Sequence, residues 1–71
     1  MPKLYSSKHI IKILESKGFF FISQKGSHTK YRKTGKNTLT VIVPNPKKEI
    51  PSGTFRSILR QAGLTEADFE K

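Results

Sequence analysis

One stretch of the chain decides how the rest is arranged: Gln24-Lys25-Gly26-Ser27-His28-Thr29-Lys30-Tyr31-Arg32. It contains a turn signal at Lys25-Gly26, and an apolar run lies on each side of it, at residues 19–22 and 39–43. Short apolar runs that are rich in strand-forming residue types and bounded by glycines indicate β-strands. We therefore expect strands over residues 19–22, 28–33 and 38–43, joined by short loops into an antiparallel meander.

A helix is predicted before this meander. Apolar side chains recur at helical spacing at Ile10, Ile13 and Leu14, which predicts a helix over residues 7–17. A serine just before it, Ser6 or Ser7, can cap the helix by accepting from free amides of its first turn.

A second helix is predicted after the meander. Pro44 and Pro46 are expected to fall in a connection rather than in a strand, because proline lacks the donor that a central strand needs. Helical spacing then returns after residue 51, with an apolar stripe at Phe55, Ile58, Leu59 and Ala62. Gly63 is suited to end this helix, and Thr65 with Asp68 forms a capping-box pattern for one last short turn.

The predicted order of elements is helix, three strands, helix and short helix, within one domain over residues 1–71. Two amphipathic helices can cover one face of the sheet and leave the other exposed, which is a two-layer α+β sandwich. The core is expected to use Tyr31, the five phenylalanines and the aliphatic residues. The chain has no cysteine, so neither a disulfide framework nor a thiolate zinc site is expected to support the fold.

Charge is the strongest global feature of the sequence. Fourteen Lys and Arg against five Asp and Glu give a net charge of +9 on 71 residues. Such an excess is typical of proteins with a polyanionic partner, most often nucleic acid. No apolar stretch is long enough to span a membrane and the N-terminus lacks the apolar region of a signal peptide, so a cytoplasmic location without membrane contact is expected.

Strand alternation indicates what chemistry the central stretch could carry. If Tyr31 packs toward the helices, the opposite face carries His28, Lys30 and Arg32. Such a face suits RNA, because cations hold phosphates and an imidazole can move a proton near neutral pH. RNA supplies its own nucleophile, the 2′-hydroxyl, so neither a metal nor another cofactor is required. Lys25 is a further candidate for holding a phosphate.

Gly26 and Ser27 would let a phosphate approach backbone amides in the turn. Simpler readings stay open for the whole stretch: the Gly-Ser pair can be only a turn, the cations can be solvated strand residues, and His28 can be a polar surface residue. The second histidine, His9, is expected to contact solvent or the helix cap. Lys47 and Lys48 read as an exposed loop within possible reach of RNA. No metal-ligand spacing and no paired carboxylates are present.

Several segments of the sequence resemble a known family. Gly18-Phe19, residues 24–28 with Tyr31-Arg32, and Gly53-Thr54 followed by residues 56–64 closely resemble the HicA (YcfA-like) toxins, over nearly the whole chain. The resemblance implies a fold like a double-stranded-RNA-binding domain and a ribosome-independent endoribonuclease that cleaves mRNA and arrests growth. It also implies a HicB-like antitoxin, encoded beside the toxin, that blocks the activity.

The resemblance also assigns roles to residues. The catalytic histidine of the family corresponds to His28, and the glycine and serine before it correspond to Gly26 and Ser27. Many members carry a second histidine just after this one and another near the end of the third strand. Thr29 and Asn45 stand at these places here, which leaves His28 as the sole strong proton carrier. Two other functions are also compatible with the sequence: a non-catalytic module for double-stranded RNA, and a basic surface that docks an acidic protein.

Overall fold

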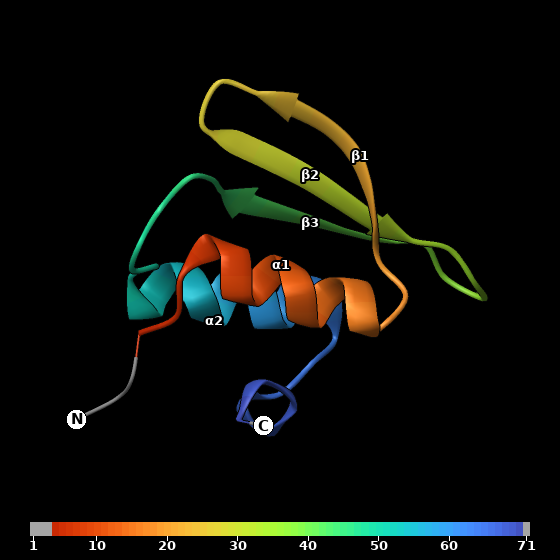
Figure 1. Cartoon of the computed structure of the whole chain (residues 1–71). Helices are drawn as coiled ribbons and strands as arrows, with labels where there is room; N and C mark the ends of the chain where they lie inside the picture. Colours follow the sequence, from red (N-terminus) through yellow and green to blue (C-terminus); the bar gives the residue numbers. More distant parts are fainter. Residues whose placement is uncertain (1–3, 71) are drawn as a thin grey trace.

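The structure is a computed structural model that describes residues 4–70 (Figure 1). Its elements, in chain order, are α1 (Ser7–Ser16), β1 (Phe20–Lys25), β2 (His28–Lys33), β3 (Leu39–Pro44), α2 (Ser52–Ala62) and a closing 3-10 turn, η1 (Glu66–Phe69). The three strands form one antiparallel sheet in the order β1-β2-β3. This is the predicted α-β-β-β-α order, with the expected short element at the end.

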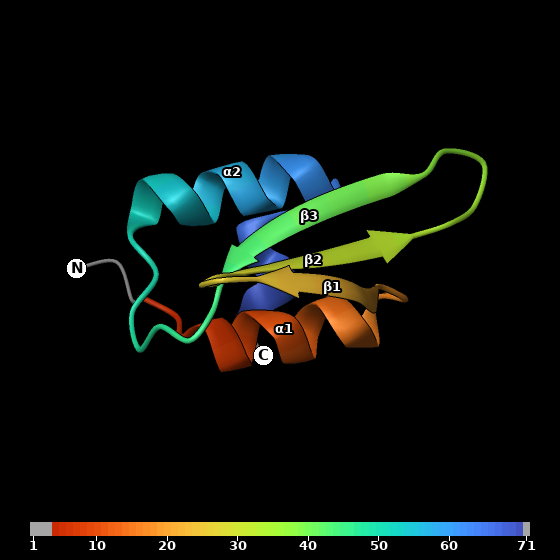
Figure 2. The same cartoon turned by 90° about the horizontal axis from the view of Figure 1, so that it is seen from above.

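Both helices lie on the same face of the sheet (Figure 1). Seen from above, α1 runs along the β1 side and α2 along the β3 side (Figure 2). Within residues 4–70, the opposite face of the sheet carries no helix (Figure 1). The predicted fold class is therefore confirmed: an α+β two-layer sandwich with the layout of a double-stranded-RNA-binding domain.

The core lies between the sheet and the helices. Its buried apolar residues come from every element except β1, and from the loops: Ile10, Leu14, Phe19, Tyr31, Val41, Val43, Ile50, Ile58, Leu59, Ala62 and Phe69. Phe69 in η1 completes the cluster, and its ring packs edge-on against Phe55 with 5.1 Å between the ring centroids. The last turn thus seals the apolar faces of the two helices, which a chain with so few apolar residues needs.

Two of the three strands, β1 and β3, have bounds that differ from the prediction. The first strand does not span residues 19–22; it begins at Phe20 and continues to Lys25, directly before the turn. The polar residues of its second half, which the sequence predicts to be a loop, pair with β2. Pro44 was expected outside the sheet, yet it is the last residue of β3. β3 is an edge strand, where a missing amide donor is tolerated.

The expectation that all five phenylalanines belong to the core is wrong for two of them. Phe20 is 45% exposed and Phe21 is 54% exposed. Phe20 pairs with Arg32, on the face without helices, and Phe21 lies opposite Tyr31 with a ring contact at 6.0 Å. Both belong to β1, the edge strand, which leaves large apolar side chains in contact with solvent.

The predicted helix ends are found with their caps. Ser6 caps α1, and its Oγ accepts from the amide of His9 at 3.1 Å. Gly63 ends α2 with a positive φ of 67°, which glycine adopts without a steric penalty. The imidazole of His9, however, is not simply solvated: it stacks on Tyr5 with 4.9 Å between the ring centroids.

Candidate functional site

The site is built on the face of the sheet that no helix covers, here called the open face. Thr29 is 1% exposed and Tyr31 is 6% exposed, because both point into the helix side of β2. Since side chains alternate along a strand, His28, Lys30 and Arg32 occupy the open face. This is the arrangement that the sequence predicted on the condition that Tyr31 packs inward.

A β-bulge at Ile22 adds Lys25 to the open face. Phe20 lies opposite Arg32 on this face, so strict alternation would turn Lys25 toward the helices. The pairing register shifts between Phe21 and Ser23, and one extra residue reverses the alternation beyond it. Lys25 therefore lies directly opposite His28, at the distance of cross-strand neighbours.

Apolar and hydroxyl side chains complete the open face. Ile42 pairs with Lys30, and the Nε of Arg32 donates to the Oγ1 of Thr40 at 3.4 Å. Phe20 and Ile42 remain exposed among the cations. None of the three strands contains an Asp or Glu, so no carboxylate on the sheet offsets the positive charge. The open face can therefore attract phosphates and offers an aromatic ring to a nucleobase.

The turn beside His28 has a defined geometry. Lys25 pairs with His28, so the loop between β1 and β2 consists of Gly26 and Ser27 alone. Gly26 has a positive φ of 59°, which suits the first central position of a tight hairpin turn. The Gly26 carbonyl accepts from Nε2 of Gln24 at 3.2 Å, and the Ser27 carbonyl accepts from the amide of Asn45 at 2.8 Å. Both of these bonds use carbonyls, so neither occupies the amides of the turn.

A hydrogen-bond network fixes the same end of the molecule. The Oγ of Ser7 donates to Oδ1 of Asn45 at 3.0 Å, and it accepts from the amide of Lys47 at 3.0 Å. The amide of Ser7 donates to the Lys47 carbonyl at 2.9 Å. Together with the bond from Asn45 to Ser27, this network joins the start of α1, the loop after β3 and the hairpin turn next to His28.

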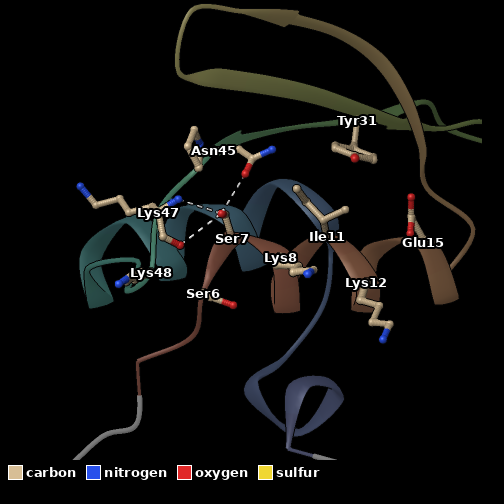
Figure 3. Close-up of a pocket in the computed structure, with 11 residues that line it drawn as sticks. Ser6, Ser7, Lys8, Ile11, Lys12, Glu15, Tyr31, Asn45, Lys47 and Lys48 are labelled. Carbon is tan, nitrogen blue, oxygen red and sulfur yellow. Dashed lines mark hydrogen bonds between the residues drawn. The ribbon is translucent and has the colours of Figure 1, made fainter.

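An open groove of about 930 Å³ lies beside this network, between α1 and the sheet (Figure 3). Ile11 and Tyr31 face each other across it. Four lysines and one carboxylate are among its lining residues: Lys8, Lys12, Lys47, Lys48 and Glu15. The pKa of the Tyr31 hydroxyl is raised, chiefly because burial disfavours the phenolate and also because of the negative charge of Glu15.

The described part of the chain contains neither a metal site of protein side chains nor a helix that could span a membrane. Within residues 4–70, no three His, Cys, Asp or Glu side chains are grouped so that they could hold a metal ion. No helix in the described part of the chain is long and apolar enough to cross a membrane.

Comparison with known protein families decides the assignment. The family model described as "HicA toxin of bacterial toxin-antitoxin" matches residues 7–64, which is most of the chain. The chain belongs to the HicA toxin family. It is therefore the toxin component of a bacterial toxin–antitoxin system, a system that pairs each toxin with an antitoxin. None of the curated proteins compared with the chain matches it.

The residues expected to form the site of this HicA-family toxin lie on one face of the sheet and in the turn that adjoins it. His28, Lys25, Lys30 and Arg32 share the open face, and Gly26-Ser27 forms the adjoining turn. Their roles in catalysis and RNA binding stay predictions. The lysines of α1 that line the groove, Lys8 and Lys12, are not among the predicted site residues. Their i, i+4 spacing would have placed them on one side, but no sequence signal showed that the loop after β3 faces them.

Proposed function

We propose that this toxin is a metal-independent and ribosome-independent endoribonuclease that cleaves mRNA with His28 as its catalytic residue. The observation that carries the proposal is one solvent-exposed imidazole on a sheet face that holds three cations and no carboxylate. The family assignment supports a toxic activity, and the net charge of +9 supports a polyanionic substrate.

The proposed reaction uses the 2′-hydroxyl of the RNA as nucleophile. As general base, His28 accepts the proton of this hydroxyl while the 2′-oxygen forms a bond to phosphorus and the bond from phosphorus to the 5′-oxygen breaks. The 5′-oxygen leaves with a proton, supplied by protonated His28 or by water. The products are a 2′,3′-cyclic phosphate and a free 5′-hydroxyl, so atoms and charge balance without a redox step.

The cations act on the phosphate. Lys25 lies opposite the imidazole, so its ammonium can stabilise charge that develops on the non-bridging oxygens. Lys30 and Arg32 follow His28 at every second residue, a spacing that suits neighbouring phosphates of an extended strand. The backbone amides of Gly26 and Ser27 and the Ser27 hydroxyl are further donors for a phosphate at the turn.

We propose that a HicB-like antitoxin neutralises this activity and that the toxin acts in the cytoplasm on single-stranded or structured mRNA. The test is to incubate the purified toxin with a mixed RNA in the presence of a chelator and to analyse the ends of the products. The proposal requires cleavage with cyclic-phosphate ends. Tight binding without products would instead identify a binding module for double-stranded RNA, and no RNA affinity at moderate salt would identify a docking surface for an acidic protein.

A further inference from the structure

The groove between α1 and the sheet has no role in the reaction just described. It contacts neither Lys30 nor Arg32, and it opens on the helix side of the sheet rather than on the open face. Its volume of about 930 Å³ lies in the range of sites that hold small organic ligands. We propose that it is a second RNA subsite, which takes an unpaired nucleotide of the substrate strand beyond the two that flank the cleavage site; this rests on the proposed function.

The composition of the groove matches a nucleotide. Ile11 and Tyr31 supply an apolar wall for a base (Figure 3), and the side chain of Asn45 supplies a polar edge. The ammonium groups of Lys8, Lys12, Lys47 and Lys48 supply positive charge for the flanking phosphates. Glu15 is the one carboxylate among the lining residues, so the net charge of the lining remains positive.

The groove lies close enough to His28 for one RNA strand to contact both. Asn45 lines the groove, and its backbone N–H donates a hydrogen bond to the carbonyl of Ser27, the residue just before His28. Pro44, the residue before Asn45, pairs with His28 across the sheet. A strand that passes the end of the sheet at this point meets the imidazole on one side and the groove on the other.

A single strand fits this path better than an acidic protein segment does. Lys25 on the open face and the lysines of the groove lie on two sides of one end of the sheet, and a flexible backbone with regularly spaced charge can reach both. The apolar wall between the cations suits a base, because every base presents a flat apolar face. The groove therefore sets how long an RNA must be to bind well, while the open face performs the cleavage.

The test compares two double variants with equal loss of charge. Lys8→Ala/Lys48→Ala removes a cation from each side of the groove, and both side chains are exposed, so the fold is retained. Lys36→Ala/Arg56→Ala is the matched control, because both residues are exposed and neither lines the groove. Each variant is assayed on a dinucleotide and on a single-stranded RNA of about twelve nucleotides, a length within the usual site size of single-strand binders.

The groove variant is expected to raise KM severalfold on the longer RNA, with kcat unchanged, and to cleave the dinucleotide at the normal rate. For the groove variant, the slope of log affinity against log salt should become shallower by about 1.4, which is about 0.7 for each lost phosphate contact. The control should keep the wild-type slope. Equal behaviour of the two variants on the longer RNA would overturn the subsite.

RNA binding can be measured after His28→Ala is added to each variant. This measurement tests the subsite independently of the proposed cleavage. If the wild-type protein cleaves no RNA, the nuclease proposal fails, but the loss of salt slope in the groove variant still supports the subsite. Photocrosslinking of thiouridine-containing RNA should label peptides that contain Ile11 or Tyr31. Labelling confined to Phe20 and Ile42 would overturn the subsite. The subsite would also be overturned if the groove variant kept its RNA affinity but lost binding of polyglutamate. That result would assign the groove to an acidic protein.

Discussion

Lys25 lies directly opposite His28 across the first two strands, although strict alternation along β1 would have turned it toward the helices. The bulge at Ile22 is responsible, because one unpaired residue reverses the face on which all later side chains lie. The imidazole therefore has an ammonium group as its cross-strand neighbour. In the proposed reaction, this ammonium stabilises negative charge at the phosphate that His28 serves.

Replacing Lys25 tests this relationship. Lys25→Ala should lower the rate of RNA cleavage, and Lys25→Glu should lower it further, because a carboxylate opposite His28 repels the phosphate. The effect should shrink as salt is raised, since screening weakens exposed charge interactions. Initial rates at low and high salt measure it. Lys36→Ala, in the turn between β2 and β3, is the control; equal losses for Lys36 and Lys25 would show that only overall charge matters.

Gly26→Ala tests the geometry of the hairpin turn. A Cβ at this position would meet no atom within 4 Å, so the cost arises from the positive φ of 59° and not from a clash. We expect the free energy of unfolding to fall by about 1–2 kcal/mol, the usual penalty for an L-residue in a left-handed conformation. Urea denaturation measures it.

Gly35→Ala is the matched control for the turn, because a Cβ there also meets open space and no positive φ is required. It should be neutral or slightly stabilising, since alanine restricts the unfolded chain. A Gly26→Ala protein as stable as the Gly35→Ala protein would contradict the assigned turn conformation.

Phe20→Ala tests the aromatic ring on the open face. Phe20 is 45% exposed, so its removal should change the stability of the protein little. If a base stacks on the ring, the affinity for single-stranded RNA should fall by about 1–3 kcal/mol, the usual value for one stacked base. Fluorescence anisotropy measures the affinity. Phe21→Ala is the control, because Phe21 belongs to the same strand but points to the helix side; loss of affinity in that variant alone would contradict the stacking role.

The lowered pKa of Asp68 makes the stability of the protein depend on pH in the acid range. The amide of Thr65 and the ammonium of Lys17, whose Nζ lies 3.2 Å from Oδ1, hold the pKa of this carboxyl below its ordinary value of 3.8. A lowered folded-state pKa means that the carboxylate stabilises the fold above pH 3.8 and that this contribution is lost as the pH falls through the lowered pKa.

The Asp68→Asn protein should therefore have a lower Tm than wild type at neutral pH, and the difference should shrink in acid below pH 3.8. Thermal unfolding at several pH values measures it, with Glu70→Gln as a control at an exposed position. A difference in Tm that stays constant down to strong acid would show that the ionised carboxylate is not responsible.

Much of the fold could be predicted because its local signals agree with one another. The stripe of α2 from Phe55 to Ala62 is both helical in spacing and buried on one side, and Gly63 supplies the αL residue that ends it. The inward position of Tyr31 follows from simple alternation once the helices cover one face. These features depend on spacing over a few residues, which a sequence displays directly.

The features that the sequence did not predict depend on pairing between distant segments. The bulge at Ile22 exists only in the register between β1 and β2, so the position of Lys25 beside His28 could not be seen in the order of residues. Likewise, the bonds from Ser7 to the loop after β3 span about forty positions, and they complete the groove. The exposure of Phe20 and Phe21 depends on how far the rest of the chain covers β1, which their residue type does not show.

The central claim is that the exposed imidazole of His28 moves the proton in RNA cleavage, and the most direct measurement is the initial cleavage rate of the His28→Ala protein. His28 is exposed, so the variant should keep the circular dichroism spectrum and Tm of the wild type. Its rate on a single-stranded RNA should fall by about 10²–10⁴-fold, the usual contribution of general acid–base catalysis. A folded His28→Ala protein that cleaves RNA at the wild-type rate would contradict the account.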